Sequence, residues 1–181
     1  HLAMEKATIL FPNSPIVLYG HSMGENIAIN FALREFSPMS LLIATSPWLK
    51  LTKNSSGVMN LLVSFLNLVV PSLQIKAPVK AEDISHDPEI IESYRNDPLN
   101  HGKITPRLMH EMNMASQFAI NNIERLKEPF LLIHGISDPI TRYEESYKLS
   151  QRAPHCSFIP FKDMYHELHN ETINKEVFRI I

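Results

Sequence analysis

The chain has 181 residues, 44% of them hydrophobic, which suits a single domain with a sizeable core. Lys and Arg number 17 against 19 Asp and Glu, and the net charge of −2 without a basic stripe argues against nucleic acid as a partner. Cys156 is the single cysteine, so an internal disulfide and a Cys-rich metal site are excluded, and we expect it to be a small core residue. The histidines are scattered, so we expect neither a metal site nor a cofactor.

Strand and helix patterns alternate along the chain, which is typical of an α/β fold with a parallel sheet and crossover helices. Compact apolar runs predict buried strands at residues 15–19, 40–44, 129–134 and 156–161. Helical spacing predicts helices over residues 25–36 and 144–152. A closing helix is expected to begin near Asn170 and to be still running at Ile181.

Residues 48–126 differ from the rest because their patterns are helical, with no convincing strand. An insertion of that length in a small sheet protein is usually a cap or lid over a site. We therefore divide the chain into a core segment at 1–47, a helical cap at 48–126 and a second core segment at 127–181.

One segment of this cap, residues 58–73, is strongly apolar, yet it is too short to span a bilayer and Pro71 breaks it. Polar residues recur along it every three to four positions and form a narrow stripe on an otherwise apolar helix. Two interpretations stay open: a helix packed into the cap, or an interfacial helix that contacts a membrane or micelle. The stripe consists of Asn60, Ser64 and Asn67.

The motif Gly20-His21-Ser22-Met23-Gly24 lies between a predicted strand and a predicted helix. A nucleophilic serine in this motif sits on a sharp strand-to-helix turn with strained backbone angles, and flanking glycines let chain segments approach. The turn places Ser22 at a helix N-terminus, where the Met23 N–H would be one donor to an oxyanion. The motif thus predicts that Ser22 is the nucleophile of a serine hydrolase.

A serine hydroxyl needs a base and an orienting carboxylate, which in this type of fold follow in the order Ser, acid, His, each just beyond a strand. Asp138 follows the third predicted strand and His166 follows the fourth. Asp163 is an alternative acid and His169 an alternative base, but an acid from the preceding strand end suits the topology better, and His169 falls close to the closing helix. Two further histidines are expected to be hydrogen-bonded structural residues near the site: His21 and His134.

These motifs resemble the monoacylglycerol lipase and lysophospholipase branch of the α/β-hydrolases over nearly the whole chain. The resemblance rests on residues 20–24, 132–138 and 165–168, with support from 46–47 and 94–99. It implies a partial α/β-hydrolase fold with a mainly parallel sheet and a helical cap. It also implies hydrolysis of single-chain lipid esters, monoacylglycerol or lysophospholipid, through an acyl-enzyme. It assigns Ser22, Asp138 and His166 as the triad and Met23 as an oxyanion donor.

The chain departs from this family in two respects. Glu25 stands where members commonly carry a small residue, and a carboxylate aimed into the site would oppose the oxyanion. No His-Gly loop for the second oxyanion donor precedes the motif, since only 19 residues stand before Gly20. We therefore expect a chain that lacks the N-terminal half of the sheet, leaves the strand at 15–19 as a bare apolar edge, and ends inside a helical pattern at Ile181.

Function stays open between three hypotheses because a fold does not fix an activity. The first is the lipid-ester hydrolase, the second a non-enzymatic binding protein of the same fold, and the third an amide hydrolase like the serine aminopeptidases. The expected partner is a small-molecule lipid ester, with membrane or micelle contact through the cap, in the cytoplasm or at a membrane surface. Three methionines of the cap could line an acyl pocket or belong to the core: Met109, Met112 and Met114.

Overall fold

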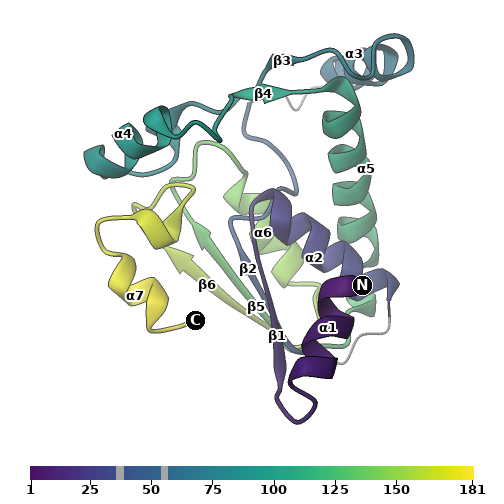
Figure 1. Ribbon diagram of the computed structural model, residues 1–181, viewed down its shortest axis with the longest axis vertical. Coiled ribbons are helices and arrows are strands. Elements are labelled where there is room, and N and C mark those ends of the chain that lie inside the picture. The colour runs from purple at the N-terminus through teal and green to yellow at the C-terminus, as the bar shows by residue number, and fades with distance from the viewer. Residues whose placement is uncertain (36–38, 54–56) are drawn as a thin grey trace.

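The computed structural model describes residues 1–35, 39–53 and 57–181. Its centre is a four-stranded parallel sheet with the strand order β1-β2-β5-β6 (Figure 1). The strands are β1 (Ile16–His21), β2 (Met39–Thr45), β5 (Phe130–Gly135) and β6 (Cys156–Phe161). The predicted parallel sheet is confirmed, and each strand lies within two residues of its expected position.

Helices connect these strands and flank the chain ends. Helix α1 (Leu2–Leu10) precedes β1, α2 (Met23–Arg34) joins β1 to β2, and α6 (Tyr143–Ser150) joins β5 to β6. The predicted end of the second helix at Phe36 lies outside the described residues. The expected long closing helix is wrong: a 3-10 turn, η3 (Leu168–Asn170), is followed by the short α7 (Asn174–Phe178). The turn forms because polar groups at 170–171 bond to other segments instead of continuing a helix.

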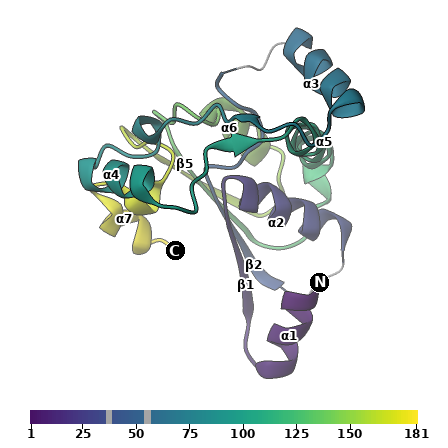
Figure 2. The ribbon, with the colours of Figure 1, turned by 45° about the horizontal axis from the view of Figure 1, so that its top comes forward.

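The insertion between β2 and β5 lies at the end of the sheet to which the strand arrows point (Figure 1). It contains α3 (Gly57–Val69), η1 (Ala81–Asp83), α4 (Pro88–Asn96), α5 (Pro106–Asn122) and η2 (Ile123–Arg125). The expectation that this region has no strand needs correction, because β3 (Ile75–Lys76) pairs antiparallel with β4 (Lys103–Ile104). Two-residue strands are too short to leave a period in the sequence. Figure 2 shows α3 projecting at the outer end of this insertion.

The core has one apolar cluster on each face of the sheet, since consecutive strand residues point to opposite faces. Leu132 belongs to the cluster beneath α2, where Ile29 and the α5 residue Ala119 are fully buried. Ile133 belongs to the opposite cluster, with Val177 of α7. The second half of α5 therefore packs as part of the core.

Strand β1 forms the edge of the sheet within the described residues, where it pairs with β2 alone. On the face opposite α2 its side chains Val17 and Tyr19 are 49% and 45% exposed. This arrangement agrees with the expected apolar edge. Cys156, at the start of β6, is partly buried against the α2-side cluster, and burial raises the pKa of its thiol to about 11.

Candidate active site

Ser22 occupies a strained turn between β1 and α2. Its backbone angles are φ 54° and ψ −115°, a conformation that costs a non-glycine residue about 1–3 kcal/mol. The turn is held from both sides: the Ser22 N–H donates to Thr45 O at 3.0 Å, and Ser22 O accepts from the Trp48 N–H at 3.1 Å. Met23 is the first residue of α2, so its N–H has no partner within the helix. These features match the local geometry that a nucleophilic serine requires.

The two motif glycines have different roles in this chain. A Cβ on Gly20 would lie 2.5 Å from Glu25 Cα, so the close approach of β1 to the first turn of α2 requires glycine there. A Cβ on Gly24 would meet nothing within 4 Å. The expectation that the flanking glycines avoid a clash of a Cβ with neighbouring chain segments therefore holds for Gly20. It is wrong for Gly24, where the described residues leave room for a Cβ.

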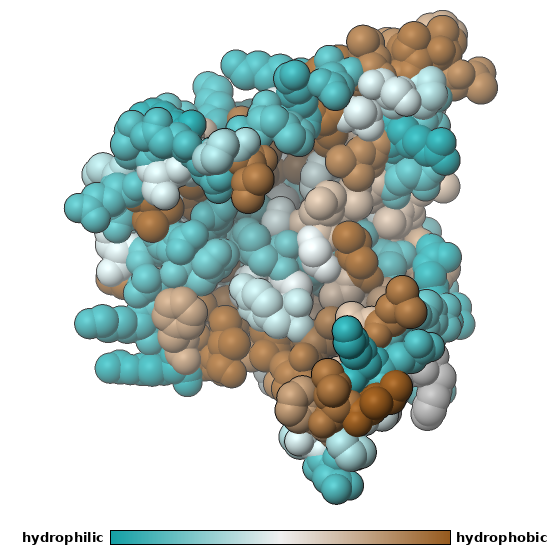
Figure 3. Space-filling model, viewed as in Figure 1, coloured by the Kyte–Doolittle hydropathy of each residue, from teal (hydrophilic) through white to brown (hydrophobic). Residues whose placement is uncertain are grey.

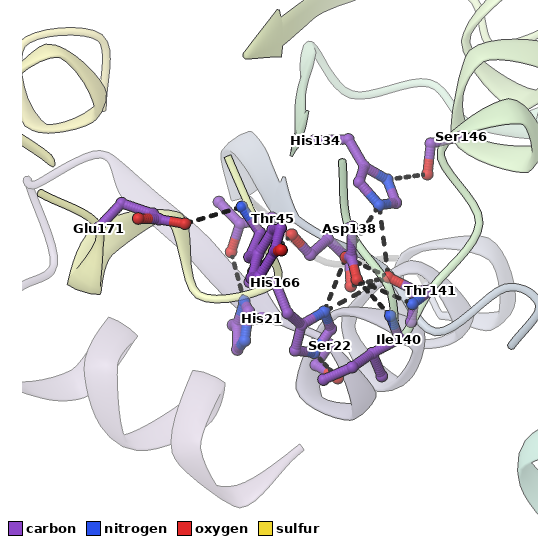
Figure 4. A network of polar contacts seen from close by, with 12 residues as sticks. His21, Ser22, Thr45, His134, Asp138, Ile140, Thr141, Ser146, His166 and Glu171 are labelled. Carbon is purple, nitrogen blue, oxygen red and sulfur yellow. Dashed lines mark hydrogen bonds and ion pairs between the residues drawn. The ribbon is translucent and has the colours of Figure 1, made fainter. Parts of the chain in front are cut away.

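A continuous hydrogen-bond chain connects Ser22, His166 and Asp138 (Figure 4). His166 Nε2 lies 2.9 Å from Ser22 Oγ, and His166 Nδ1 lies 2.8 Å from Asp138 Oδ2. His166 is 6% exposed and Asp138 7% exposed, whereas Ser22 is half-buried. The structure thus brings together the three residues, distant in sequence, that the motifs single out.

The position of the proton in this series of hydrogen bonds follows from the charge of the Asp138 carboxylate. Burial raises the pKa of Asp138, but hydrogen bonds from His134 and His166 outweigh burial and hold that pKa well below its usual range. An ionised carboxylate only accepts hydrogen bonds, so the proton of His166 resides on Nδ1. His166 Nε2 is then the acceptor for the Ser22 hydroxyl, as a general base must be.

Asp138 receives several donors besides His166. Its Oδ1 accepts the backbone N–H groups of Ile140 and Thr141 at 2.7 and 3.0 Å, and its Oδ2 accepts the Thr141 hydroxyl at 2.7 Å. His134 Nε2 lies 3.1 Å from Oδ2, while Ser146 Oγ lies 2.7 Å from His134 Nδ1. Thr141 was not predicted from the sequence, although an Asp followed by Pro, Ile and Thr is typical of such a side-chain-capped turn.

The loop that carries His166 approaches β5 closely. A Cβ on Gly135 would lie 2.4 Å from Met164 O, so glycine is required where β5 ends. The His166 carbonyl accepts the Ser46 hydroxyl at 2.7 Å. Ser46, fully buried after β2, was noted in the sequence only as part of a Ser-Pro pair and proves to hold the histidine loop.

The two alternative residues lie apart from the hydrogen-bond chain. Asp163 is exposed in a left-handed turn with φ 57°. His169 stacks edge-on against His21 with ring centroids 5.0 Å apart, and its buried Nδ1 has no hydrogen-bond partner among the described residues. Asp138 and His166 are thus the acid and the base that the geometry favours.

Comparison with known proteins identifies the family. A family model described as "Serine aminopeptidase, S33" (Hydrolase_4) matches residues 1–173. The chain belongs to this hydrolase family. It is 26% identical to a monoacylglycerol lipase of Mycolicibacterium smegmatis and 27% identical to the phospholipase YtpA of Bacillus subtilis, covering 92% and 91% of this chain. The match spans 60% and 65% of those relatives' own lengths.

The hydrolase fold is also evident from solved structures. The crystal structure of a monoacylglycerol lipase from Paleococcus ferrophilus superposes with a TM-score of 0.88 at 27% identity, over 98% of this chain and 71% of that one. The predicted α/β-hydrolase fold, partial in extent, is confirmed. This chain resembles monoacylglycerol lipases in sequence and in structure.

Glu25, the unusual residue of this hydrolase, is fully buried in the first turn of α2. Neither carboxyl oxygen has a hydrogen-bond partner among the described residues. Burial raises the pKa of Glu25 well above its ordinary value, so the site favours the uncharged carboxyl. A neutral carboxyl carries no charge that would oppose an oxyanion at Met23.

His21 lies beside the base and stays neutral. Its ring centroid is 4.9 Å from that of His166, and its Nδ1 lies 3.0 Å from Thr45 Oγ1. Burial, reinforced by His166 and His169, lowers the pKa of His21 to about 3. A second positive charge therefore does not form next to His166 when His166 accepts a proton. His21 and His134 both lie at the site as hydrogen-bonded neighbours, as expected.

A cavity of about 320 Å³ lies between α3, α5 and residues 49–51. None of Ser22, His166 and Asp138 lines this cavity, and its wall begins at Leu49, next in sequence to Trp48, whose backbone N–H bonds to Ser22 O. Of the three methionines, Met109 lines the cavity, Met112 is buried and Met114 is exposed. Apolar side chains supply much of the wall, including Leu49, Met59, Val63, Leu66, Met109 and Ile120.

Helix α3 turns Met59, Val63 and Leu66 toward the cavity and leaves most of its other apolar side chains exposed. Asn60 and Ser64 lie 3.4 Å from Asn113 and His110 of α5, respectively. Figure 3 shows the resulting apolar surface at the edge of the molecule where α3 lies. No helix of the described part is long and apolar enough to cross a membrane. The side chains more than half exposed on this helix are Val58, Leu61, Phe65, Leu68 and Val69.

The described residues contain no group of three or more His, Cys, Asp or Glu side chains arranged to hold a metal ion.

Proposed function

We propose that this chain carries the catalytic residues of a serine hydrolase that cleaves carboxylic esters of single-chain lipids, monoacylglycerol or lysophospholipid. The observation that carries the proposal is the hydrogen-bond chain from Ser22 through His166 to Asp138. The names of the similar proteins, monoacylglycerol lipase and phospholipase, support the same substrate class.

Acylation begins when Ser22 Oγ attacks the ester carbonyl carbon and its proton passes to His166 Nε2, 2.9 Å away. The ionised Asp138 stabilises the resulting imidazolium. The Met23 N–H, at the N-terminus of α2, donates to the carbonyl oxygen as negative charge develops there. The C–O bond then breaks, His166 returns the proton to the leaving alcohol oxygen, and Ser22 holds the acyl group.

Deacylation repeats these steps with water as the nucleophile. Water gives a proton to His166 Nε2 as its oxygen bonds to the acyl carbon. The bond to Ser22 Oγ breaks, and the proton on His166 moves to that oxygen. The products are a fatty acid and the free Ser22 hydroxyl, so atoms and protons balance over the cycle.

The cap surroundings favour a lipid substrate over a polar one. The apolar part of the cavity wall would gain free energy from burying an acyl chain, at about 25 cal/mol per Å² of apolar surface removed from water. The outward apolar face of α3 would bury the same kind of side chain in a micelle or membrane surface. We propose that α3 contacts the lipid aggregate from which the substrate is drawn.

A fluorophosphonate probe tests the nucleophile, applied to the 181-residue chain and to any longer translated product that contains it. We expect the probe to label Ser22 and the Ser22→Ala variant to stay unlabelled. Absence of label on Ser22, or equal label on the variant, would refute the proposed chemistry. A Ser157→Ala variant is a suitable control, because Ser157 is exposed in β6 and lies outside the hydrogen-bond chain of Ser22, His166 and Asp138.

Substrate class is tested by comparing p-nitrophenyl esters of increasing chain length with aminoacyl anilides. The description of the matching family as a serine aminopeptidase makes amide cleavage the competing activity. We expect hydrolysis of the esters with a preference for long acyl chains. Faster cleavage of anilides would support the peptidase, and tight lipid binding without turnover would support a binding protein.

Contact of α3 with lipid is tested by placing charges on its exposed face. Leu61→Asp and Leu68→Asp, at positions 73% and 82% exposed, should lower turnover of emulsified monoacylglycerol and leave turnover of a soluble short-chain ester unchanged. Leu99→Asp, at a position 84% exposed in another segment, is the matched control. Equal loss on both substrates, or no loss on the emulsion, would contradict the contact.

A further inference from the structure

The loop that carries His166 lacks regular secondary structure around the histidine, yet its peptide groups are tied on both sides. Before the histidine, the Tyr165 N–H donates to Glu171 Oε1 at 2.8 Å. After it, the Glu167 N–H donates to Ile84 O at 2.8 Å. The position of the base therefore depends on one buried carboxylate and on a segment of the insertion.

Glu171 is 3% exposed and is the centre of these contacts. Besides Tyr165, its carboxylate contacts His86: Oε2 accepts the His86 N–H at 3.2 Å, and Oε1 lies 2.9 Å from His86 Nδ1. The His86 ring also stacks on Tyr165, with centroids 3.8 Å apart. Figure 4 shows Glu171 reaching toward the loop from the side away from Asp138. One carboxylate thus joins the insertion to the residue that precedes His166.

Neighbouring residues strengthen the same connection. The Ser85 hydroxyl donates to Asn170 O at 2.8 Å, and Ile84 and Ser85 are each 1% exposed. Buried hydrogen bonds of this kind are costly to break, because an orphaned buried group loses about 1–3 kcal/mol of solvation. We call these four residues, 84–86 and Glu171, the clamp, because together they hold the histidine loop in place.

We infer that Glu171 is a positioning residue for His166. Through the clamp, the insertion helps to hold the histidine loop, in addition to any role as a cap over the site. The inference rests on the proposed function, since it concerns the base of that reaction. Glu171 does not touch the reacting atoms in this structure. It acts by fixing the peptide at Tyr165, and so the ring that must reach both Ser22 and Asp138.

The expected effect follows from how sharply turnover depends on geometry. A misplacement of about 1 Å can cost about 100-fold in rate. Glu171→Ala removes every clamp contact of the carboxylate, so kcat should fall about 100-fold. Glu171→Gln keeps an oxygen that can accept from Tyr165 but turns an amide donor toward the His86 N–H, so a smaller fall is expected.

The experiment measures kcat on a soluble ester, divided by the number of sites that the fluorophosphonate titrates. Labelling is followed to completion, since a displaced base slows it, and the normalisation then separates positioning from partial unfolding because an unfolded fraction is not titrated. We expect kcat per titrated site to fall in the order wild type, Glu171→Gln, Glu171→Ala, with KM little changed. Glu124→Ala is the control, since its carboxylate forms a surface ion pair with Arg152 and is 65% exposed.

Hydrogen exchange of the peptide at 162–171 gives a readout that needs no activity. In Glu171→Ala the amides of this peptide should exchange at least about 10-fold faster, while the amides of β2 and β5 keep their wild-type rates. Unchanged kcat per titrated site together with unchanged exchange at 162–171 would overturn the inference. A wild-type chain that neither labels nor turns over would instead refute the proposed function and leave the exchange result to decide on the clamp.

Discussion

Glu25 makes the stability of this chain depend on pH in a direction that can be worked out. Its carboxyl is fully buried, has no hydrogen-bond partner among the described residues, and has a pKa raised by burial. A group whose pKa is higher in the folded state than in the unfolded chain stabilises the fold fully below the unfolded pKa. That contribution is lost as the pH rises from the ordinary value of 4.5 toward the folded pKa.

The magnitude follows from linkage. One proton bound in the folded state and released in the unfolded chain changes the free energy of unfolding by about 1.4 kcal/mol per pH unit. Between pH 5.5 and pH 7.0 the wild type should therefore lose up to about 2 kcal/mol through Glu25. Glu25→Gln keeps the volume and cannot ionise, so the variant should gain the same amount relative to the wild type over this interval.

Equilibrium urea unfolding at both pH values measures this difference. Trp48 is the single tryptophan, and its backbone N–H bonds to Ser22 O, so its fluorescence reports on the surroundings of the site. The control Glu176→Gln, at an exposed position on α7, should follow the wild type. If the wild type and Glu25→Gln differ by the same free energy at pH 5.5 and pH 7.0, the buried carboxyl does not hold a linked proton and the reasoning is refuted.

Three further predictions concern the framework of the site. In Gly135→Ala the added Cβ would lie 2.4 Å from Met164 O, so the histidine loop must shift, and kcat should fall about 100-fold in a soluble-ester assay. Unchanged turnover there would show that the loop tolerates the shift. Asp138→Asn should lower kcat about 10⁴-fold because an amide no longer selects the working tautomer of the base, and its pH–rate profile would test this. Asn26→Ala removes the buried amide that bonds to Trp48 O at 2.7 Å and to Ser116 Oγ at 2.8 Å. It should lower the free energy of unfolding by about 1–3 kcal/mol in urea unfolding. An unchanged free energy of unfolding would show that these two hydrogen bonds do not stabilise the chain.

The strands and the order of the site residues could be predicted because both leave local signals. Each strand is an apolar run between turn residues, and Ser22, Asp138 and His166 each stand just beyond such a run. Parallel strands place their carboxyl ends at one edge of the sheet, so residues far apart in sequence converge there. Short motifs and topology together were enough to name three residues that a hydrogen-bond chain joins.

Other features escaped prediction because they depend on contacts between distant segments. The apolar period after Asn170 favoured a long helix, yet Glu171 uses its carboxylate on Tyr165 and His86, and the chain turns instead. The stripe of α3 gave no orientation, because a sequence does not show which side of a helix meets its neighbour. In the structure Val63 is the buried side chain of this helix, and Asn60 and Ser64 contact α5 from exposed positions.

The insertion supports the site from two directions, which changes how substitutions in it should be interpreted. Near the nucleophile, the Ser116 hydroxyl of α5 bonds to Trp48 O, and the Trp48 backbone N–H bonds to Ser22 O. On the other side, Glu167 beside the base bonds to Ile84 O. The nucleophile and the base are thus held by different parts of one inserted segment. Because the 2.9 Å contact between Ser22 and His166 depends on both parts, a change in the insertion that moves one part relative to the other should lower kcat even where it leaves the cavity intact.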